Sequence, residues 1–224
     1  MVDGHHKLNK NSYQELLEMT KFRISSDWHT EFYQYKSHIG GPRDCSSGTF
    51  LKPMENEKEQ VLILAGDIIN TKSIDMINNT HPMDNLFLNL SLRFKKIFII
   101  AGNHEHYSDN YRYAKDKLDS YFTSKFDNIH YLEKESFLYD GVLIFGATLW
   151  TNFSNDYTKM DYARRGMNDF RVIYNGPADM PTSVLLSPEA TVYDHNETIS
   201  VIEEYIKTPY KKLIITHHSP SFIS

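Results

Sequence analysis

Two short apolar runs, each ending at a glycine with polar residues behind it, limit what this chain can fold into. Residues 61–65 read VLILA and residues 97–101 read IFIIA, followed by Gly66-Asp67 and Gly102-Asn103-His104 respectively. Continuous β-branched runs of this length are typical of strands buried on both faces of a mainly parallel sheet. Glycine permits a sharp turn at the strand end, and open α/β folds bind ligands at the carboxyl ends of their strands. The pattern therefore predicts a metal site at this sheet edge.

The order of the remaining segments predicts two sheets. We expect strands at residues 21–27, 96–101, 129–132, 136–139, 142–148 and 212–216, and helices at 84–94, at 109–122 and from Pro188 onward. The strands after residue 129 follow one another without helices between them, which indicates a further sheet that holds all three. We therefore predict an α/β fold, a four-layer α/β/β/α sandwich of two mixed sheets flanked by helices. Residues 30–58 show no helical period and residues 150–176 are polar, aromatic and turn-rich, so both segments are predicted to be loops beside the site.

Composition narrows the class of protein. A chain of 224 residues with 40% hydrophobic content can form one sizeable core, and we assign residues 1–20 to a polar leader and 21–224 to one domain. No apolar run is long enough to span a bilayer and no secretory signal is visible, so we expect no membrane partner and a cytoplasmic protein. The formal charge of −5 implies no general electrostatic affinity for nucleic acid, although it does not exclude a local basic groove. The oligomeric state is not indicated.

Four of the expected strands end in residues that bind metal ions. These are Asp27 with His29, then Asp67, then Asn103 with His104, and finally His217 with His218. Borderline divalent ions favour carboxylate, amide oxygen and imidazole together, and a pair of ions needs a carboxylate between them, for which Asp67 is the natural candidate. Asp27 and His29 are two apart on one extended segment, so we expect them to face the same way and bind one ion. Asn103 and His217 would complete much of a second site.

The order of these strand ends resembles that of the calcineurin-like metallophosphoesterase family. The family pattern is D-x-H, then G-D, then G-N-H-[D/E], then a histidine at a strand end, then G-H-x-H. This chain has SDWH at residues 26–29, AGD at 65–67, AGNHE at 101–105 and ITHHSPS at 215–221. Two further segments, GATLWT at 146–151 and MNDF at 167–170, look like a bacterial and phage branch of that family. The resemblance covers about residues 21–221.

The resemblance implies a metal-dependent phosphoesterase with two divalent ions, of which Mn²⁺, Fe and Zn²⁺ all suit mixed nitrogen and oxygen ligands. It implies that Asp27, His29 and Asp67 hold the first ion. It also implies that Asp67, Asn103 and His217 hold the second. A hydroxide bridging the ions would be the nucleophile, and His104 would be the general acid that protonates the leaving oxygen. A phosphodiester or nucleotide is the favoured small-molecule substrate, and a phosphomonoester is left open.

The sequence departs from the family pattern in one respect, because G-H-x-H has no counterpart before Ser224. The simplest interpretation is a truncated sequence that lacks C-terminal strands of the second sheet. His218, Glu105 or His106 could instead replace the missing ligands, or a second chain could contribute them. If neither holds, these three residues would lie behind the ligands or contact the substrate. Two other hypotheses follow: a catalytically incomplete metal- or nucleotide-binding protein with the same fold, or a structural domain with vestigial strand ends.

Overall fold

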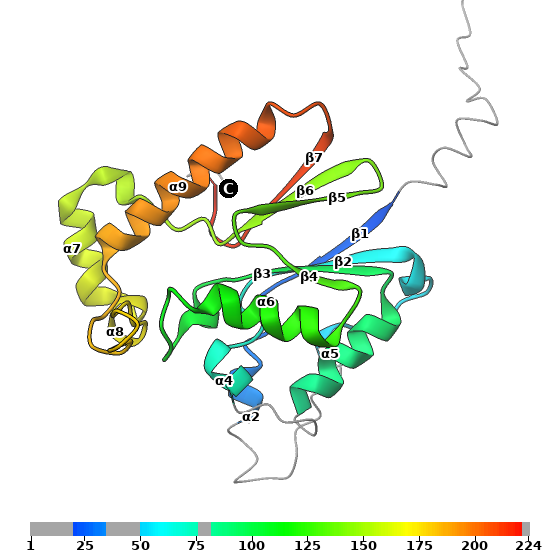
Figure 1. Ribbon diagram of the computed structural model, residues 1–224, viewed down its shortest axis with the longest axis horizontal. Coiled ribbons are helices and arrows are strands. Elements are labelled where there is room, and N and C mark those ends of the chain that lie inside the picture. Colours follow the sequence, from blue (N-terminus) through cyan, green and yellow to red (C-terminus); the bar gives the residue numbers. More distant parts are fainter. Residues whose placement is uncertain (1–19, 35–49, 76–81, 221–224) are drawn as a thin grey trace, which may run out of the picture.

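The protein folds into two sheets stacked face to face, with helices on their outer sides (Figure 1). The computed structural model describes residues 20–34, 50–75 and 82–220. The expected polar leader, apart from Thr20, lies outside these ranges. The first sheet contains β1 (Lys21–Ser25), β2 (Gln60–Ala65), β3 (Lys96–Ile100) and β4 (Ile129–Tyr131), and the second contains β5 (Glu135–Tyr139), β6 (Val142–Ala147) and β7 (Lys211–Thr216). The expected two-sheet α/β fold is confirmed.

The first sheet is buried on both faces, as the continuous apolar runs predict. Its strands lie in the order β1-β2-β3-β4, and all described neighbours are parallel, so this sheet is purely parallel and not mixed. Alternate side chains point to opposite faces of each strand. Leu62 and Ile99 join the core beneath α5 (Pro82–Arg93) and α6 (Ala114–Lys125), whereas Ile63 and Phe98 pack toward the second sheet. Both faces of β2 and β3 thus become interior.

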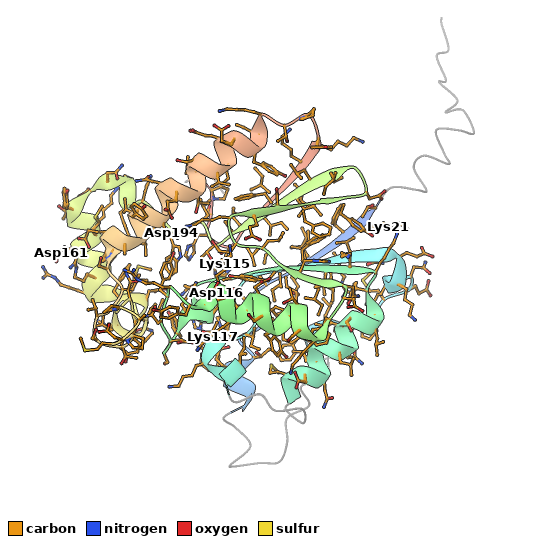
Figure 2. All side chains as sticks on the ribbon, in the orientation of Figure 1. Lys21, Lys115, Asp116, Lys117, Asp161 and Asp194 are labelled. Atoms are coloured by element: carbon orange, nitrogen blue, oxygen red, sulfur yellow. The ribbon has the colours of Figure 1, made fainter. Side chains whose placement is uncertain are left out.

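The second sheet is mixed. β5 is antiparallel to β6, and β6 is parallel to β7, which follows the long helix α9 (Pro188–Ile206). Ser187 caps α9 by accepting from the backbone N–H of Ala190, and Pro188 occupies the first turn, as the sequence predicts. The Tyr205 ring of α9 packs on Phe145 of β6, so this helix covers the outer face of the second sheet (Figure 1). Side chains fill the space between the layers (Figure 2).

Two expectations about the fold are wrong. Residues 129–132 belong to the first sheet, because β4 pairs with β3 and the N–H of Leu132 donates to the carbonyl of Ile99 at 2.9 Å. Helix α6 lies before residue 129 and connects these two parallel strands as a crossover. The lack of a helix after residue 129 therefore does not indicate to which sheet residues 129–132 belong. Residues 150–176 are not loop throughout, since they contain α7 (Tyr157–Gly166) and α8 (Asp169–Val172). Only Met160 and Ala163 of α7 are buried and its other residues are exposed, so its polar composition resembles that of a loop.

The remaining boundaries differ little from the prediction. The expected helices 84–94 and 109–122 correspond to α5 and α6, and the latter begins five residues later than expected, at Ala114. Residues 30–58 contain the short helix α2 (Glu31–Gln34), which the sequence does not predict, and 35–49 lie outside the described ranges. No helix in the described ranges is both long and apolar enough to cross a membrane.

Candidate metal centre

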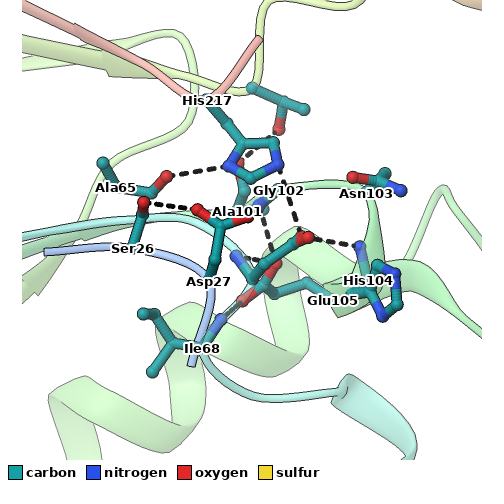
Figure 3. Close-up of polar contacts among 12 residues, drawn as sticks. Ser26, Asp27, Ala65, Ile68, Ala101, Gly102, Asn103, His104, Glu105 and His217 are labelled. Carbon is teal, nitrogen blue, oxygen red and sulfur yellow. Dashed lines mark hydrogen bonds and ion pairs between the residues drawn. The ribbon is translucent and has the colours of Figure 1, made fainter. Parts of the chain in front are cut away.

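The polar residues predicted at four strand ends lie together at one edge of the sandwich (Figure 3). Asp27 and His29 follow β1, Asp67 follows β2, Asn103 and His104 follow β3, and His217 follows β7. Glycine permits the close approach. A Cβ on Gly66 would lie 2.5 Å from Nδ1 of His217, and one on Gly102 would lie 2.2 Å from Oδ1 of Asp67. A larger residue at either position would displace the ring of His217 or the carboxylate and backbone of Asp67.

Asp67 lies at the middle of this arrangement. Its Oδ1 is 3.5 Å from Nε2 of His217, and its Oδ2 is 3.7 Å from Nε2 of His29. Oδ1 also accepts a hydrogen bond from the backbone N–H of His104 at 2.9 Å, which fixes the carboxylate plane. Each oxygen of one carboxylate therefore faces a different imidazole. That is the orientation a carboxylate needs if it is to bridge two ions.

The donor atoms fit the metals that the sequence pattern implies. Nδ1 of His217 is 2.8 Å from the carbonyl oxygen of Ala65, to which it donates, so Nε2 keeps its lone pair toward Asp67. One ligand atom each from Asp27, His29 and Asp67 lie within 4.8 Å of one another. Nδ2 of Asn103 donates to the Tyr107 hydroxyl at 3.3 Å, which turns the amide oxygen away from that ring. Carboxylate, imidazole and amide oxygen are a suitable set for a borderline divalent ion.

The backbone at these residues is strained. Asp27, His29 and Asp67 have φ values of 58°, 47° and 57°, in the left-handed region that residues other than glycine seldom adopt. The expectation that Asp27 and His29 share an extended segment is therefore wrong. The N–H groups of these two residues donate to the carbonyls of Gly66 and Asp67, at 3.0 and 2.9 Å, so the β1 loop is tied to the β2 loop. These bonds, and not strand pleating, bring the side chains together.

Glu105 organises the turn that carries Asp67. Its carboxylate is buried and accepts hydrogen bonds from the backbone N–H groups of Asp67, Ile68, Ile69 and Gly102, at 2.9, 2.7, 3.2 and 2.6 Å. Burial and the neighbouring charge of Asp67 raise the pKa of Glu105, whereas the amide donors lower it. The described contacts of Glu105 are with backbone, so it is neither solvated nor placed as a ligand in this structure. It acts behind the candidate ligands.

The candidate acid His104 has a partner that the sequence analysis did not identify. Oε1 of Glu31 is 3.0 Å from Nδ1 of His104 and 3.4 Å from Nδ1 of His29. Burial lowers the pKa of His104, but the hydrogen bond with Glu31 and the charges of Asp67, Glu31 and Glu105 outweigh it and raise the pKa above its usual value. The His104 ring also stacks on the Tyr107 ring, with 4.0 Å between the ring centroids. The spacing D-x-H-x-E at residues 27–31 is the signal that could have revealed Glu31.

His106 and His218 lie behind the centre. His106 is buried against Tyr111 and Trp150, and burial lowers its pKa to about 4, so it is a neutral interior residue and not a solvated one. The backbone N–H of His218 donates to the carbonyl of Thr148, and the His218 ring packs edge-on against Trp150. Burial also lowers the pKa of His218. His218 faces a cavity, which is described below.

This edge, where carboxylates and imidazoles from both sheets of an α/β sandwich meet, has the arrangement of a metal-dependent phosphoesterase. Comparison with known proteins agrees, since residues 20–223 match the calcineurin-like phosphoesterases. The chain belongs to the calcineurin-like phosphoesterase family. The family implies divalent metal ions.

Two similar proteins extend the comparison. An uncharacterized protein of Acanthamoeba polyphaga mimivirus is 31% identical over 211 residues, which cover 91% of this chain and 69% of that protein. The crystal structure of the phosphopantetheinyl hydrolase from Mycobacterium tuberculosis superposes with a TM-score of 0.51 at 16% identity, covering 89% of this chain and 68% of that one. At this low identity the second likeness shows the fold alone. It agrees with the two-sheet architecture described above.

Proposed function

We propose that the chain is a phosphoesterase that uses two divalent ions. In this proposal Asp27, His29 and Asp67 hold one ion. Asp67, Asn103 and His217 hold the other. The observation that carries the proposal is the position of Asp67, whose two oxygens face the Nε2 atoms of two histidines from different strand ends. We favour a phosphodiester or nucleotide substrate. The ligand roles rest on the donor set and the strand-end geometry.

The chain's own residues supply orientation and a proton. Bound divalent ions would offset the charge of the phosphate and lower the pKa of the attacking water. His104, held by Glu31 and by its stacking on Tyr107, donates a proton to the leaving oxygen. The oxygen of water forms the new bond to phosphorus as the water loses one proton to solvent, the bond to the leaving oxygen breaks, and the proton from His104 neutralises that oxygen. Glu105 takes no proton in this scheme, because it is committed to the backbone of the Asp67 turn.

Turnover of bis(p-nitrophenyl) phosphate with added Mn²⁺, measured together with metal content, tests the proposal. His104→Gln should lower kcat by about 10²-fold or more through loss of the proton donor, while the bound metal is retained. His130→Gln is the matched control, because His130 lies on β4 beside Lys96 and away from the centre, and it should change kcat less than about twofold.

A different result would support the alternative hypothesis. Bound metal without metal-dependent turnover, in the wild type and both variants, would indicate a catalytically incomplete binding protein with the same fold. Absence of bound metal together with absence of turnover would refute the proposed metal centre itself.

A further inference from the structure

Two cavities flank the candidate centre, and they differ in chemistry. The smaller, of about 440 Å³, contains the candidate acid, and its lining includes Glu31, Phe32, Lys72, His104 and Tyr107. Charged groups of both signs and two aromatic rings thus face the same space. Because His104 lines this cavity, the oxygen that it protonates must lie at this side of the phosphate.

The larger cavity, of about 670 Å³, is mainly apolar. Its apolar lining includes Trp150, Phe153, Met167, Phe170 and Ile199. Its polar lining includes Asn152, His195 and His218, and no Lys, Arg, Asp or Glu is among the lining residues of the described chain. A charged group entering this space would lose hydration without gaining an ionic partner, whereas an uncharged ring would gain apolar contact. The volume is within the range of organic ligand sites.

The two cavities lie on either side of one chain segment, and each is lined by a histidine next to a candidate ligand in the sequence, His104 after Asn103 and His218 after His217. Asn168 lines the smaller cavity, whereas Met167 and Phe170, on either side of it along the chain, line the larger. His218 lines the larger cavity, and its ring centroid is 5.2 Å from that of His217, a candidate ligand. A group bound at the centre therefore has space for one substituent at the His104 side and for another at the His218 side.

We infer that the substrate is a phosphodiester with an organic group on each side, whose non-leaving group is an uncharged aromatic or heteroaromatic ring held in the larger cavity. This inference rests on the proposed phosphoesterase activity and names its substrate class. The leaving group occupies the smaller cavity, where His104 reaches its oxygen. A phosphomonoester would leave the larger cavity without a substituent, so the two-sided arrangement favours a diester.

Polar groups of the larger cavity provide an edge for recognition of such a ring. Nδ1 of His195 lies 2.5 Å from the carbonyl oxygen of Trp150, to which it donates, so Nε2 of that ring is left as an acceptor. Oδ1 of Asn152 accepts from the N–H of Ser154 at 2.9 Å, and its amide N–H groups are donors. An acceptor and a donor among the lining residues suit a heteroaromatic ring with hydrogen-bonding atoms on one edge. The apolar walls suit its faces.

Two diesters with the same leaving group test the inference. Methyl p-nitrophenyl phosphate and phenyl p-nitrophenyl phosphate both release p-nitrophenol, and only the second carries a ring for the larger cavity. In Ile199→Trp, the indole should fill the cavity, so kcat/KM for the phenyl ester should fall by about tenfold or more. The value for the methyl ester should stay within about threefold, because its small group does not need that space.

A matched control lies on the same helix. Val201 is 38% exposed and does not line the cavity, so Val201→Trp should not change kcat/KM for either ester. Met167→Trp provides a second obstruction from another element, in case the first variant does not fold, and it should show the same selective loss.

The outcomes separate this inference from the proposed function. Turnover of both esters with a phenyl-to-methyl ratio that neither obstruction changes would overturn the inference and leave the phosphoesterase intact. Hydrolysis of neither ester, in a wild-type chain that has bound Mn²⁺, would refute the proposed function and the inference with it. A selective loss in both obstructed variants, absent from Val201→Trp, would support the assignment of the larger cavity.

Discussion

The buried acids at the two ends of the first sheet have different partners. At the amino end, Glu57 is paired with two arginines. Arg93 donates to both of its carboxylate oxygens at 2.8 Å, Arg23 donates at 2.7 Å, and the N–H of Met54 donates at 3.0 Å. At the carboxyl end, the imidazoles of His29 and His217 lie 3.7 and 3.5 Å from the carboxylate of Asp67, and burial and the charge of Asp67 raise the pKa of the neighbouring Glu105.

This difference agrees with a division in which the amino end serves stability and the carboxyl end serves the proposed metal binding. The hydrogen bond with Arg93 and the nearby arginine charges hold the pKa of Glu57 below its usual value, against the effect of burial, so its charged form stabilises the fold. At the carboxyl end, two acids lie close together and three residues have left-handed backbone. Such an arrangement lowers stability unless a cation binds there, which is the usual compromise at a functional site.

Replacing the acid at the carboxyl end should have the largest effect on activity. Asp67→Asn keeps an acceptor for the His104 N–H but removes the charge shared between the candidate ion sites. We expect kcat/KM for bis(p-nitrophenyl) phosphate to fall by about 10³-fold or more, equivalent to about 4 kcal/mol.

The same variant should gain stability in the absence of metal. Removing one of two neighbouring acids at pH 8 should raise the free energy of unfolding by about 1 kcal/mol, measured by urea denaturation with EDTA. A loss of metal-free stability in Asp67→Asn would contradict the proposed division between the two ends, whatever happens to turnover.

The opposite result is expected at the amino end. Glu57→Gln leaves Arg23 and Arg93 without their carboxylate, and Glu57 is only 8% exposed. Breaking a buried, hydrogen-bonded ion pair typically costs about 3 kcal/mol or more of unfolding free energy. Turnover at 20 °C should stay within about twofold, because the residue lies at the far end of the strands. Glu59→Gln, in the same short helix but outside this cluster, is the control for denaturant melts.

The sequence predicts the ends of these strands better than the contacts between them. Runs such as residues 61–65 and 97–101 specify buried strands, and their glycines mark where the polar side chains emerge. Six predicted ligand and acid residues consequently lie at one edge, although their roles stay predictions: Asp27, His29, Asp67, Asn103, His104 and His217.

The features of the site that the sequence does not predict depend on backbone angles and on contacts between residues far apart in the sequence. The left-handed φ values of Asp27 and His29 invert the expected extended geometry, and no periodicity reveals them. Glu31 lies in a four-residue helix inside an apparent loop and meets His104 across 73 positions of sequence. Its neighbour His29 is the only local hint. Eight of the ten residues of α7 are exposed, so its polar composition does not distinguish it from a loop.

Glu31 offers a smaller test of the carboxyl end. Glu31→Gln keeps the size of the side chain but removes the charge that faces Nδ1 of His104 and of His29. Partners that orient a ligand or acid from behind typically contribute about 10- to 100-fold. We expect kcat to fall by that factor at saturating Mn²⁺, with the unfolding free energy nearly unchanged. Glu135→Gln, which removes an exposed partner of Lys115, is the control, and an equal loss in both variants would argue against a specific role.

Acid pH should produce the smallest effect, and its sign distinguishes the two ends. Because the folded-state pKa of Glu57 lies below its ordinary value of 4.5, its contribution is fully present above that value. As pH falls below 4.5, the unfolded chain takes up the proton first, and the contribution is lost as pH approaches the folded-state pKa. The stability gap between wild type and Glu57→Gln, from urea melts, should therefore be constant above about pH 6 and narrow below that point. A gap that widens on acidification would mean that the protonated acid is the stabilising form, and the arginine pairing would then not explain the amino end of the sheet.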